Sequence, residues 1–440
     1  MTSEAAAIER AIGRAEAAFG QTRELPSWRR SEILRQVGAG IAARRQEFVE
    51  AIVSEAGKPV RFAEAEVDRC LVTFSLAGEE ARRPEGEVLA ADIEPRSENF
   101  WCAVEPFPRG VVAALTPFNF PLNLLAHKVA PAIACGCPVV AKPSPRTPRA
   151  ALLLQEEVRK TAWPEGAFSV VVCDNADAPL LWRDPRVAVV SFTGSDAVGW
   201  RIAEEAFRKK VILELGGNAA AIVHEDADLE DAARKLALSA FAYGGQVCIK
   251  AQRIFAARRI FDAFLDLFVA ASASLAAGNL RDPKTSLAPL IDDAAAERVS
   301  SWIEAAVAGG AVRRSGGPRD GRSIPPTILT GAPTAADVRR REVFGPVAVV
   351  DPYDAFPEAL AAVNDSDYGI HASVFTRDIG RIRSAFRTLR VGGVLVNEAP
   401  STRIDNFPYG GLKSSGAGRE GVRSTIREYT EPRVLLISSS

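Results

Sequence analysis

Two residues of the chain are of types that can carry out nucleophilic and base chemistry. Cys248 follows a pair of glycines in the segment FAYGGQVCIKAQR, and a cysteine becomes a strong nucleophile as the thiolate. Glu214 ends the apolar run VILEL just before a Gly-Gly-Asn turn, where partial desolvation would raise its pKa toward that of a general base. Each also has a plainer interpretation, because most free cysteines are small buried hydrophobes and strand-end acids often cap helices.

The loop TPFNFPL (116–122) follows the apolar run VVAALT and contains Asn119. An amide side chain held in such a loop can donate a hydrogen bond to a developing oxyanion. The plainer interpretation is an asparagine that forms a turn.

Two further strand ends have the features of a phosphate site. In SFTGSDAVG, Gly194 and Ser195 end an apolar run and open a helix, so backbone N–H groups and a hydroxyl would face a pyrophosphate. Lys142, in AKPSPRTP, ends another run and can reach a ribose or a phosphate. A common Gly-Ser turn and a solvated lysine are the alternatives.

These residues lie at the ends of short apolar runs that alternate with helical segments. The runs are VVAALT (111–116), PVVAKP (138–143), FSVVVC (168–173), VAVVSF (187–192) and VILEL (211–215). Continuous Val- and Ile-rich runs between helices predict a parallel sheet covered on both faces, whose loops at the strand carboxyl ends bind nucleotides. We therefore expect an α/β fold with a doubly wound, Rossmann-type domain.

A second alternation of helices and strands begins at about residue 217. Its expected helices cover 260–277 and 292–308, and its expected strands cover 326–330, 347–350, 372–376 and 392–397. Two outlying segments, 92–108 and 434–438, also have the pattern of strands. We expect them to pair with each other or with a partner subunit.

The bulk composition excludes several classes of protein. The 440 residues include 54 Lys and Arg against 55 Asp and Glu, and a net charge of −1 gives no support for a nucleic-acid or membrane partner. The amino terminus is not that of a secretory signal, and no apolar run is long enough to predict a membrane helix. Six cysteines without a disulfide pattern favour reduced thiols in the cytoplasm. With three histidines and no Cys-x-x-Cys pair, we expect no metal site.

Eight blocks of sequence, in one order, resemble the aldehyde dehydrogenase superfamily over nearly the whole chain. They are TPFNFPL, VVAKPS, FTGS, ELGGN, GGQVC, EVFGPV, GGVLVN and PYGGLKSSGAGREG. The interval between Glu214 and Cys248, 248 − 214 = 34 residues, also suits the base and nucleophile of that family. The resemblance implies an NAD(P)-dependent enzyme that oxidises a small-molecule aldehyde to a carboxylate.

The resemblance implies a role for each matched catalytic residue. Cys248 would attack the aldehyde to form a thiohemiacetal, whose oxyanion would be held by Asn119 and the Cys248 backbone N–H. Hydride transfer would leave a thioester, and Glu214 would activate the water that hydrolyses it. Lys128 and Glu420 match a proton-relay pair behind that base.

The resemblance also implies NAD or NADP as the cofactor. The expected cofactor contacts are Lys142 and Ser144 at the adenosine ribose, Gly194 and Ser195 at the pyrophosphate, Leu215 and Gly216 at the nicotinamide, Glu342 and Phe344 at its ribose, and Thr116, Pro117 and Phe118 in the adjoining loop. Phe118 would also form a wall of the aldehyde channel.

The chain departs from the family pattern in three places. Pro145 stands where many NAD-preferring members have a Glu. That carboxylate would bind the ribose diol of NAD and repel the 2′-phosphate of NADP, so its absence makes use of NADP plausible. Most of the usual N-terminal arm before the first helix is missing, which favours a homodimer over a homotetramer. His127 stands where a tryptophan is frequent, so the floor of the channel should differ.

The segment STRIDNFPYGG (401–411) and the block GQVCIKAQR are most similar to members that act on small hydroxylated or anionic aldehydes, such as lactaldehyde- or glyceraldehyde-phosphate-type enzymes. Arg403 would then meet an anionic group of the substrate. The alternative is a surface arginine paired with Asp405.

Two other functions remain open for the whole chain. In a coenzyme-A-acylating relative a thiol takes the acyl group, but such relatives commonly lack the carboxylate of Glu214. The second alternative is a catalytically silent, nucleotide-binding relative. The intact set of Cys248, Glu214 and Asn119 argues against it. The expected division is a cofactor-binding domain of residues 1–90 and 110–216, a catalytic domain of 217–432, and a small β oligomerisation element of 91–109 and 433–440.

Overall fold

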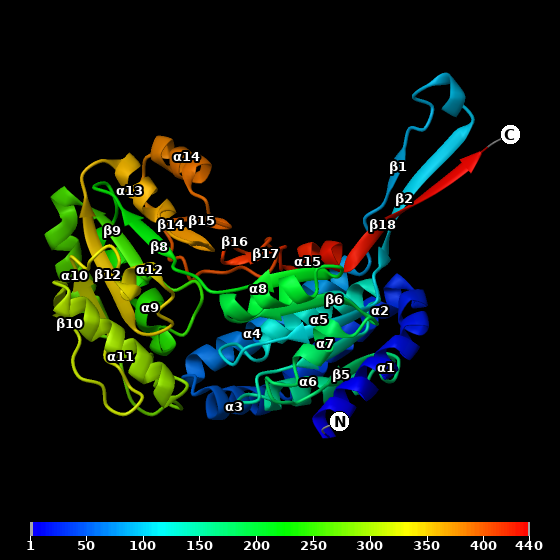
Figure 1. The fold of residues 1–440 in the computed structure, drawn as a ribbon, viewed down its shortest axis with the longest axis horizontal. Coiled ribbons are helices and arrows are strands. Elements are labelled where there is room, and N and C mark those ends of the chain that lie inside the picture. Colours follow the sequence, from blue (N-terminus) through cyan, green and yellow to red (C-terminus); the bar gives the residue numbers. More distant parts are fainter. Residues whose placement is uncertain (1–2, 439–440) are drawn as a thin grey trace.

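The computed structural model describes residues 3–438, which form two α/β lobes and a narrow arm that projects away from them (Figure 1). The polypeptide crosses between the lobes more than once, so the cleft between them is lined by segments far apart in the sequence. No helix within this described range combines the length and the apolar character needed to cross a membrane.

The first lobe is built on a six-stranded sheet in the order β17-β7-β6-β3-β4-β5. Its strands are β3 (Val111–Leu115), β4 (Val139–Lys142), β5 (Phe168–Val170), β6 (Val187–Thr193), β7 (Lys210–Glu214) and β17 (Gly416–Ala417). All neighbours are parallel except β17, which is antiparallel to β7. The five apolar runs of the sequence therefore form the predicted parallel sheet.

Helices cover both faces of this sheet, as a doubly wound fold requires. One face packs against α2 (Ser27–Ala43), α3 (Arg45–Ala56), α4 (Val60–Glu80), α5 (Asn123–Cys135), α6 (Arg149–Arg159) and α15 (Val422–Tyr429). The other packs against α1 (Ser3–Glu24), α7 (Pro179–Arg183) and α8 (Asp196–Glu205). Alternate residues of one strand serve the two cores: Val112 belongs to the first and Ala113 to the second.

The second lobe contains a seven-stranded sheet in the order β10-β11-β12-β9-β8-β14-β15. Its strands are β8 (Ala220–Val223), β9 (Arg253–Ala257), β10 (Val312–Ser315), β11 (Thr327–Thr330), β12 (Val347–Tyr353), β14 (His371–Phe375) and β15 (Gly393–Val396). Only the edge strand β10 is antiparallel to its neighbour. The strands predicted from the second alternation are β11, β12, β14 and β15.

Six helices cover the second sheet. One core contains α9 (Leu229–Phe241) and α10 (Phe261–Ala273). The cores on the other face contain α11 (Asp293–Ala308), α12 (Asp337–Arg340), α13 (Phe356–Asn364) and α14 (Ile379–Thr388). Short 3-10 turns lie at η2 (Ala242–Gly245) and η3 (Arg258–Ile260).

The arm is a three-stranded antiparallel sheet in the order β1-β2-β18. It consists of β1 (Glu87–Leu89), the turn η1 (Pro95–Ser97), β2 (Phe100–Pro108) and β18 (Thr430–Ser438). The two outlying segments identified in the sequence thus pair with each other, from Thr430 opposite Pro108 to Ser438 opposite Phe100.

The chain returns to the first lobe before it enters β18. A two-stranded sheet of β13 (Tyr368–Gly369) and β16 (Leu412–Lys413) lies at this return. β17 then joins the edge of the first sheet, and α15 packs on its helices. As a result, residues 401–420 reach the carboxyl ends of the strands of the first lobe.

Candidate active site

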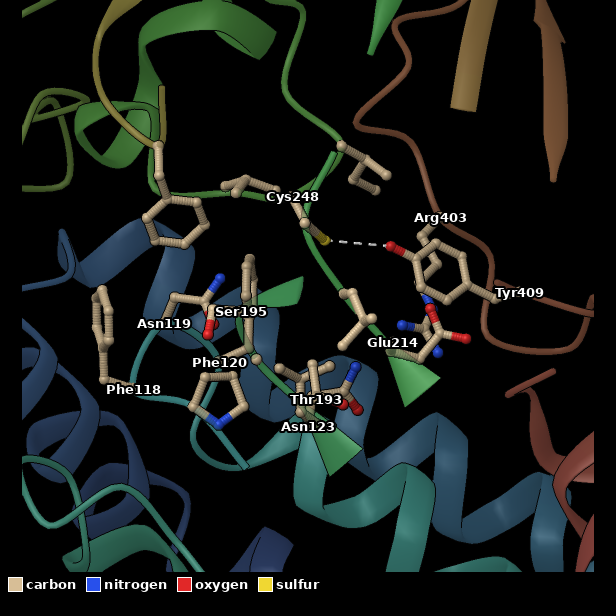
Figure 2. Close-up of a pocket in the computed structure, with 18 of the residues that line it drawn as sticks. Phe118, Asn119, Phe120, Asn123, Thr193, Ser195, Glu214, Cys248, Arg403 and Tyr409 are labelled. Atoms are coloured by element: carbon tan, nitrogen blue, oxygen red, sulfur yellow. Dashed lines mark hydrogen bonds between the residues drawn. The ribbon is translucent and has the colours of Figure 1, made fainter. Parts of the chain in front are cut away.

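The residues expected to do chemistry meet at one pocket. Glu214 ends β7 and Thr193 ends the adjacent parallel strand β6, and the loop containing Asn119 follows β3, the next strand along. Because carboxyl ends of parallel strands meet at one edge of a sheet, these three side chains face the same space. The loop carrying Cys248, from the second lobe, closes that space into a cavity of about 320 Å³ (Figure 2).

The Cys248 loop runs between η2 and β9, and the glycines before it are required by packing. Gly244 and Gly245 adopt positive φ angles of 65° and 67°. A Cβ atom on Gly245 would collide with the carbonyl oxygen of Gly345. The two glycines therefore allow a turn that places Cys248 in the cavity at the strand ends of the first lobe.

The Cys248 thiol is half-buried, and the Oη atom of Tyr409 lies 3.3 Å from its Sγ atom (Figure 2). Burial raises the pKa of Cys248 to about 12, and the Tyr409 hydrogen bond opposes that rise. The resting group is therefore a thiol, and it needs a proton acceptor and a hydrogen-bond donor to react as a thiolate.

Glu214 has the environment of a general base. Its side chain is buried, and within residues 3–438 neither carboxylate oxygen has a hydrogen-bond partner. Burial raises the pKa of Glu214 well above its usual range, and the negative charge of Glu420 adds to that rise. A carboxyl group with a raised pKa and unpaired oxygens can accept a proton from water near neutral pH.

Asn119 is held by the loop that carries the nucleophile. Its Nδ2 atom donates a 2.9 Å hydrogen bond to the carbonyl oxygen of Gln246, two residues before Cys248. An amide nitrogen has two N–H groups, so one remains for an oxygen atom in the cavity. This arrangement links the donor and the nucleophile across the two lobes.

Lys128 and Glu420, the expected relay pair, form a buried ion pair behind Glu214. Lys128 Nζ donates to Glu420 Oε1 at 2.7 Å and to Ser191 Oγ at 3.0 Å. Burial alone would raise the pKa of Glu420, but the positive charges of Lys128 and Arg403 outweigh it and lower the pKa to about 2. Glu420 therefore stays ionised, and its negative charge contributes to the raised pKa of Glu214.

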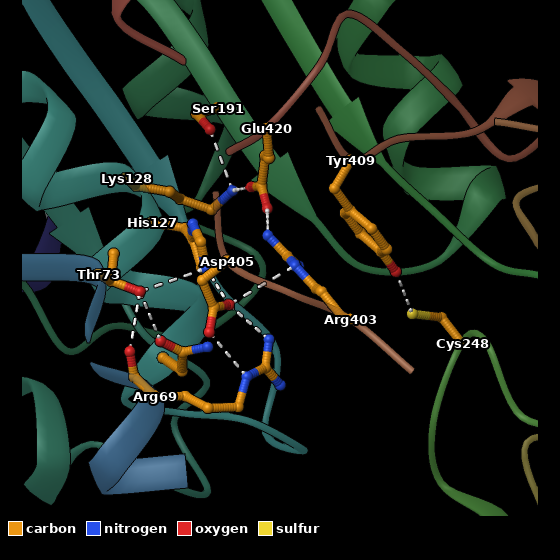
Figure 3. Close-up of polar contacts among 11 residues, drawn as sticks. Arg69, Thr73, His127, Lys128, Ser191, Cys248, Arg403, Asp405, Tyr409 and Glu420 are labelled. Carbon is orange, nitrogen blue, oxygen red and sulfur yellow. Dashed lines mark hydrogen bonds and ion pairs between the residues drawn. The ribbon is translucent and has the colours of Figure 1, made fainter. Parts of the chain in front are cut away.

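Arg403 lines the same cavity, and it is buried rather than at the surface. Its side chain is only 6% exposed, with Nη2 3.4 Å from Glu420 Oε2 and Nε 3.9 Å from Asp405 Oδ1. The alternative of a surface arginine is therefore wrong, although the proximity to Asp405 was correct. Asp405 also binds a second arginine, Arg69 of α4, through two hydrogen bonds of 2.6 and 3.0 Å (Figure 3).

His127 lies one layer below the cavity rather than forming its floor. It is buried, and its Nε2 atom lies 2.9 Å from Asp405 Oδ1. Burial and the charge of Arg403 lower the pKa of His127 to about 4, so the imidazole is neutral and its N–H donates to the carboxylate. His127 thus fixes Asp405, and Asp405 fixes Arg69, which reaches the cavity.

A second cavity continues from the first along the strand ends and suits a dinucleotide. It is lined by the predicted residues Thr116, Pro117, Phe118, Lys142, Ser144, Gly194 and Ser195, together with Arg201 and Asn175. Two buried hydroxyl oxygens, Thr116 Oγ1 and Thr193 Oγ1, have no partner among residues 3–438 and can bind a ligand. These polar groups fit the diphosphate and ribose of NAD(P).

Gly194 contributes space to this cavity rather than the N–H donor expected from the sequence. Its N–H is already bonded to the carbonyl oxygen of Glu214 at 3.0 Å. A Cβ atom at this position would collide with the ring of Phe192. Glycine is therefore required here by the close approach of the Phe192 ring.

Glu342 and its neighbours lie where the two cavities join. Glu342 Oε1 accepts a 2.9 Å hydrogen bond from the Gly217 N–H, and burial raises its pKa to about 7. A Cβ on Gly216 would come within 2.7 Å of the same carboxylate. Phe344 packs edge to face on Phe118, with ring centroids 6.0 Å apart. Leu215 lines the first cavity beside them.

Several cavity residues were not identified from the sequence, among them Arg69, Asn123 and Tyr409. Tyr409 lies inside the PYGGLKSSGAGREG block, which was a usable signal. Arg69 had none, because a single arginine in an amphipathic helix is indistinguishable from a solvated one. Residues 3–438 contain no group of three His, Cys, Asp or Glu side chains placed to hold a metal ion.

The fold and the site together define an α/β oxidoreductase with a thiol nucleophile next to a dinucleotide cavity. The model of the aldehyde dehydrogenase family matches residues 1–435. The chain therefore belongs to the aldehyde dehydrogenase family, and it is an NAD(P)-dependent aldehyde dehydrogenase.

Relatives cover nearly the whole chain. A 3-sulfolactaldehyde dehydrogenase from Priestia megaterium is 40% identical over 432 residues, 98% of this chain and 90% of that protein. The structure of aldehyde dehydrogenase 21 from Physcomitrella patens, in complex with the reaction product succinate, is 40% identical with a TM-score of 0.95, covering 97% of this chain and 89% of that one. The structure of a glyceraldehyde-3-phosphate dehydrogenase from Methanocaldococcus jannaschii, complexed with NADP, is 34% identical with a TM-score of 0.94, covering 99% and 95%.

Proposed function

We propose that this aldehyde dehydrogenase oxidises a small aldehyde that carries a negatively charged group at the end away from the carbonyl. The observation that carries the proposal is that two arginines, Arg69 and Arg403, line the cavity of Cys248. Their guanidinium Nη1 atoms have no hydrogen-bond partner among residues 3–438, so each can donate to an anionic oxygen. Guanidinium groups match the geometry of carboxylate, sulfonate and phosphate oxygens.

The charge of the site also favours an anion. Among its charged groups, Lys128, Arg69 and Arg403 are cations, while Glu420 and Asp405 are anions. Asp405 stays ionised because hydrogen bonds from His127 and Arg69 outweigh the effect of burial and lower its pKa. These five groups form one chain of ion pairs, in which the cations outnumber the anions by 3 − 2 = 1. An anionic group would neutralise that excess.

The names of the relatives support the same class of substrate. The relatives described above act on 3-sulfolactaldehyde, form succinate, or act on glyceraldehyde 3-phosphate. The sulfonate, carboxylate and phosphate groups in these compounds share a negative charge and differ in shape.

The catalytic roles follow from the geometry. The Cys248 thiol loses its proton to water, and sulfur forms a bond to the carbonyl carbon while the carbonyl electrons move to oxygen. The Asn119 amide N–H donates to that oxygen. NAD(P) bound in the second cavity would supply the hydride acceptor; when the thiohemiacetal carbon loses its hydride, the C=O bond re-forms and the acyl group stays on Cys248 as a thioester.

Glu214 would complete the cycle with water as the acyl acceptor. Its carboxylate takes a proton from water as the water oxygen attacks the thioester carbon, and the C–S bond then breaks to release the carboxylic acid. Lys128 and Glu420 stabilise the site behind this base. Because Glu214 is present and unpaired, hydrolysis is favoured over transfer to coenzyme A, and added coenzyme A should leave the rate unchanged.

The proposal is tested with matched pairs of aldehydes. Succinic semialdehyde should be a better substrate than butanal, and glyceraldehyde 3-phosphate better than glyceraldehyde. Arg69→Gln or Arg403→Gln should lower kcat/KM for the anionic member of a pair by roughly 10- to 150-fold, the effect of one charge-assisted hydrogen bond.

The controls separate this effect from general damage. Arg69→Gln should leave kcat/KM for butanal nearly unchanged, whereas Arg403→Gln should lower it less than for succinic semialdehyde, because Arg403 also lies over the Tyr409 ring. Arg383→Gln, an exposed arginine of α14, removes the same charge far from the site. Equal losses on butanal and succinic semialdehyde would refute the anion proposal. Oxidation that persists in Cys248→Ala would refute the assignment of the nucleophile.

The arm suggests how the protein assembles. β18 exposes apolar side chains on both faces, including Val434 (64% exposed) on one and Leu435 (55%) on the other, and its outer edge is unpaired among the described residues. An exposed apolar strand edge is a site for pairing with another chain. We propose that residues 91–109 and 433–438 form the contact of a homodimer, with a homotetramer as the alternative outcome; residues 439–440 of the expected element lie outside the described range.

The remaining expectations are proposals of the same kind. Residues 1–90 and 110–216 would form the cofactor-binding domain and residues 217–432 the catalytic domain. The six cysteines form no disulfide with one another, which agrees with a reducing compartment such as the cytoplasm.

A further inference from the structure

The phenol of Tyr409 lies against the proposed nucleophile, and its position is unexplained by the roles assigned so far. Tyr409 comes from a segment 161 residues after Cys248, yet Oη and Sγ are 3.3 Å apart (Figure 3). Both residues line the same cavity, and Tyr409 is buried. Among residues 3–438, Oη has no other hydrogen-bond partner.

The ring of Tyr409 is held from several sides, so the contact is not an accident of a mobile side chain. The Arg403 guanidinium lies over one face of the ring, 3.8 Å from its centroid. His371 packs edge-on, with centroids 5.2 Å apart. The backbone is fixed by two hydrogen bonds with Glu420, of 2.9 and 2.7 Å.

The chemistry of the pair decides which group donates. Burial raises the pKa of Tyr409 well above its usual range, so the phenol keeps its proton and can donate it. Arg403 lies over the electron-rich ring face, which polarises the O–H bond and strengthens it as a donor. No lysine, arginine or histidine within residues 3–438 hydrogen-bonds to Sγ.

We propose that Tyr409 is a catalytic residue whose hydroxyl donates a hydrogen bond to the Cys248 thiolate, stabilising it and aiming it at the aldehyde carbon. This inference rests on the proposed role of Cys248 as nucleophile. When the thiol proton leaves to a water molecule, the negative charge on sulfur is held by the Tyr409 O–H. Sulfur then forms the C–S bond, and the phenol retains its own proton throughout.

The test measures the thiolate without any aldehyde. Iodoacetamide alkylates the thiolate with loss of iodide, and mass spectrometry of the Cys248 peptide gives the second-order rate constant between pH 6 and pH 10. Tyr409→Phe removes one oxygen atom and keeps the ring. We expect its rate constant to be roughly 10- to 100-fold lower at each pH, as if the titration had moved upward by about one to two pH units.

Two controls isolate the hydroxyl. Tyr353→Phe removes a phenol that also hydrogen-bonds one partner, the His224 ring at 2.6 Å, but lies in the second lobe away from Cys248. It should alkylate like the wild type. Cys248→Ala measures the background from the other five cysteines, which are buried. In the wild type, fluorotyrosine incorporation, which makes the phenol a stronger donor without changing the fold, should raise the rate constant.

The outcomes are distinct. An unchanged or raised rate constant in Tyr409→Phe, at an unchanged melting temperature, would overturn the inference. If Tyr409→Phe does not fold, an unchanged rate constant after fluorotyrosine incorporation would overturn it instead. Aldehyde oxidation that depends on Cys248 would still support the proposed function in either case, whereas oxidation independent of Cys248 would remove the basis of both.

Discussion

Replacing Glu214 with Gln should separate the two halves of the reaction. Glutamine has nearly the size and shape of glutamate, and the buried Glu214 carboxyl, whose pKa is raised by burial and by Glu420, makes no hydrogen bond within residues 3–438 that the substitution would break. The substitution therefore leaves the cavity intact but removes the proton acceptor. General-base catalysis contributes roughly 100- to 10,000-fold, and this is the expected loss in the rate of thioester hydrolysis.

The assay is rapid-mixing absorbance of the reduced cofactor with succinic semialdehyde. Glu214→Gln should form close to one reduced cofactor per active site in a burst and then turn over slowly, with an acyl group on Cys248 visible by intact-protein mass spectrometry. Glu342→Gln is the matched control, because Glu342 is another cavity carboxyl with a raised pKa but is bonded to the Gly217 N–H. It should weaken cofactor binding without a stall. A Glu214→Gln enzyme with wild-type steady-state turnover would refute the base assignment.

The same substitution makes a prediction about stability. A carboxyl group whose pKa is raised by folding binds its proton more tightly in the native state than in the unfolded state. Its contribution to the free energy of unfolding is therefore full below the unfolded pKa of about 4.3, and it is lost as the pH rises to the folded pKa. Each pH unit within that window costs about 1.4 kcal/mol. Glu214→Gln cannot lose a proton, so its melting temperature should rise above that of the wild type as the pH increases from 4.5. Parallel pH profiles would contradict the buried, raised-pKa environment.

Three further predictions concern the cofactor, the arginines and the arm. Among residues 3–438, no carboxylate lines the second cavity, whereas Lys142 and Arg201 do. Arg201→Ala should therefore weaken NADP binding roughly tenfold, measured by cofactor fluorescence, and leave NAD binding nearly unchanged. Asp405→Asn should release Arg69, raising KM for succinic semialdehyde more than it lowers kcat, with little change for butanal. Leu436→Asp places a charge on the exposed arm strand and should give a monomer by light scattering; an unchanged mass would exclude the arm as the contact.

Much of the site was predictable because its chemistry is local to strand ends. Glu214, Asn119 and Lys142 each follow a continuous apolar run, and such runs predict parallel strands whose carboxyl ends share one edge. Hydrophobic patterning is a short-range property of the chain, so strand positions and the residues at their ends could be identified before the fold was known. The glycines before Cys248 were also visible, although only the packing of the Cys248 loop against Gly345 explains why glycine is needed.

Tertiary structure alone decided which distant residues meet. Arg69 and Asp405 are 336 residues apart in sequence and share two hydrogen bonds, and Tyr409 reaches Cys248 from a segment that crosses between the lobes. Such contacts depend on how whole elements pack, and no local pattern encodes them. Burial decided the rest: the raised pKa of Glu214 and the neutrality of His127 arise from desolvation and neighbouring charges, which exist only in the folded chain.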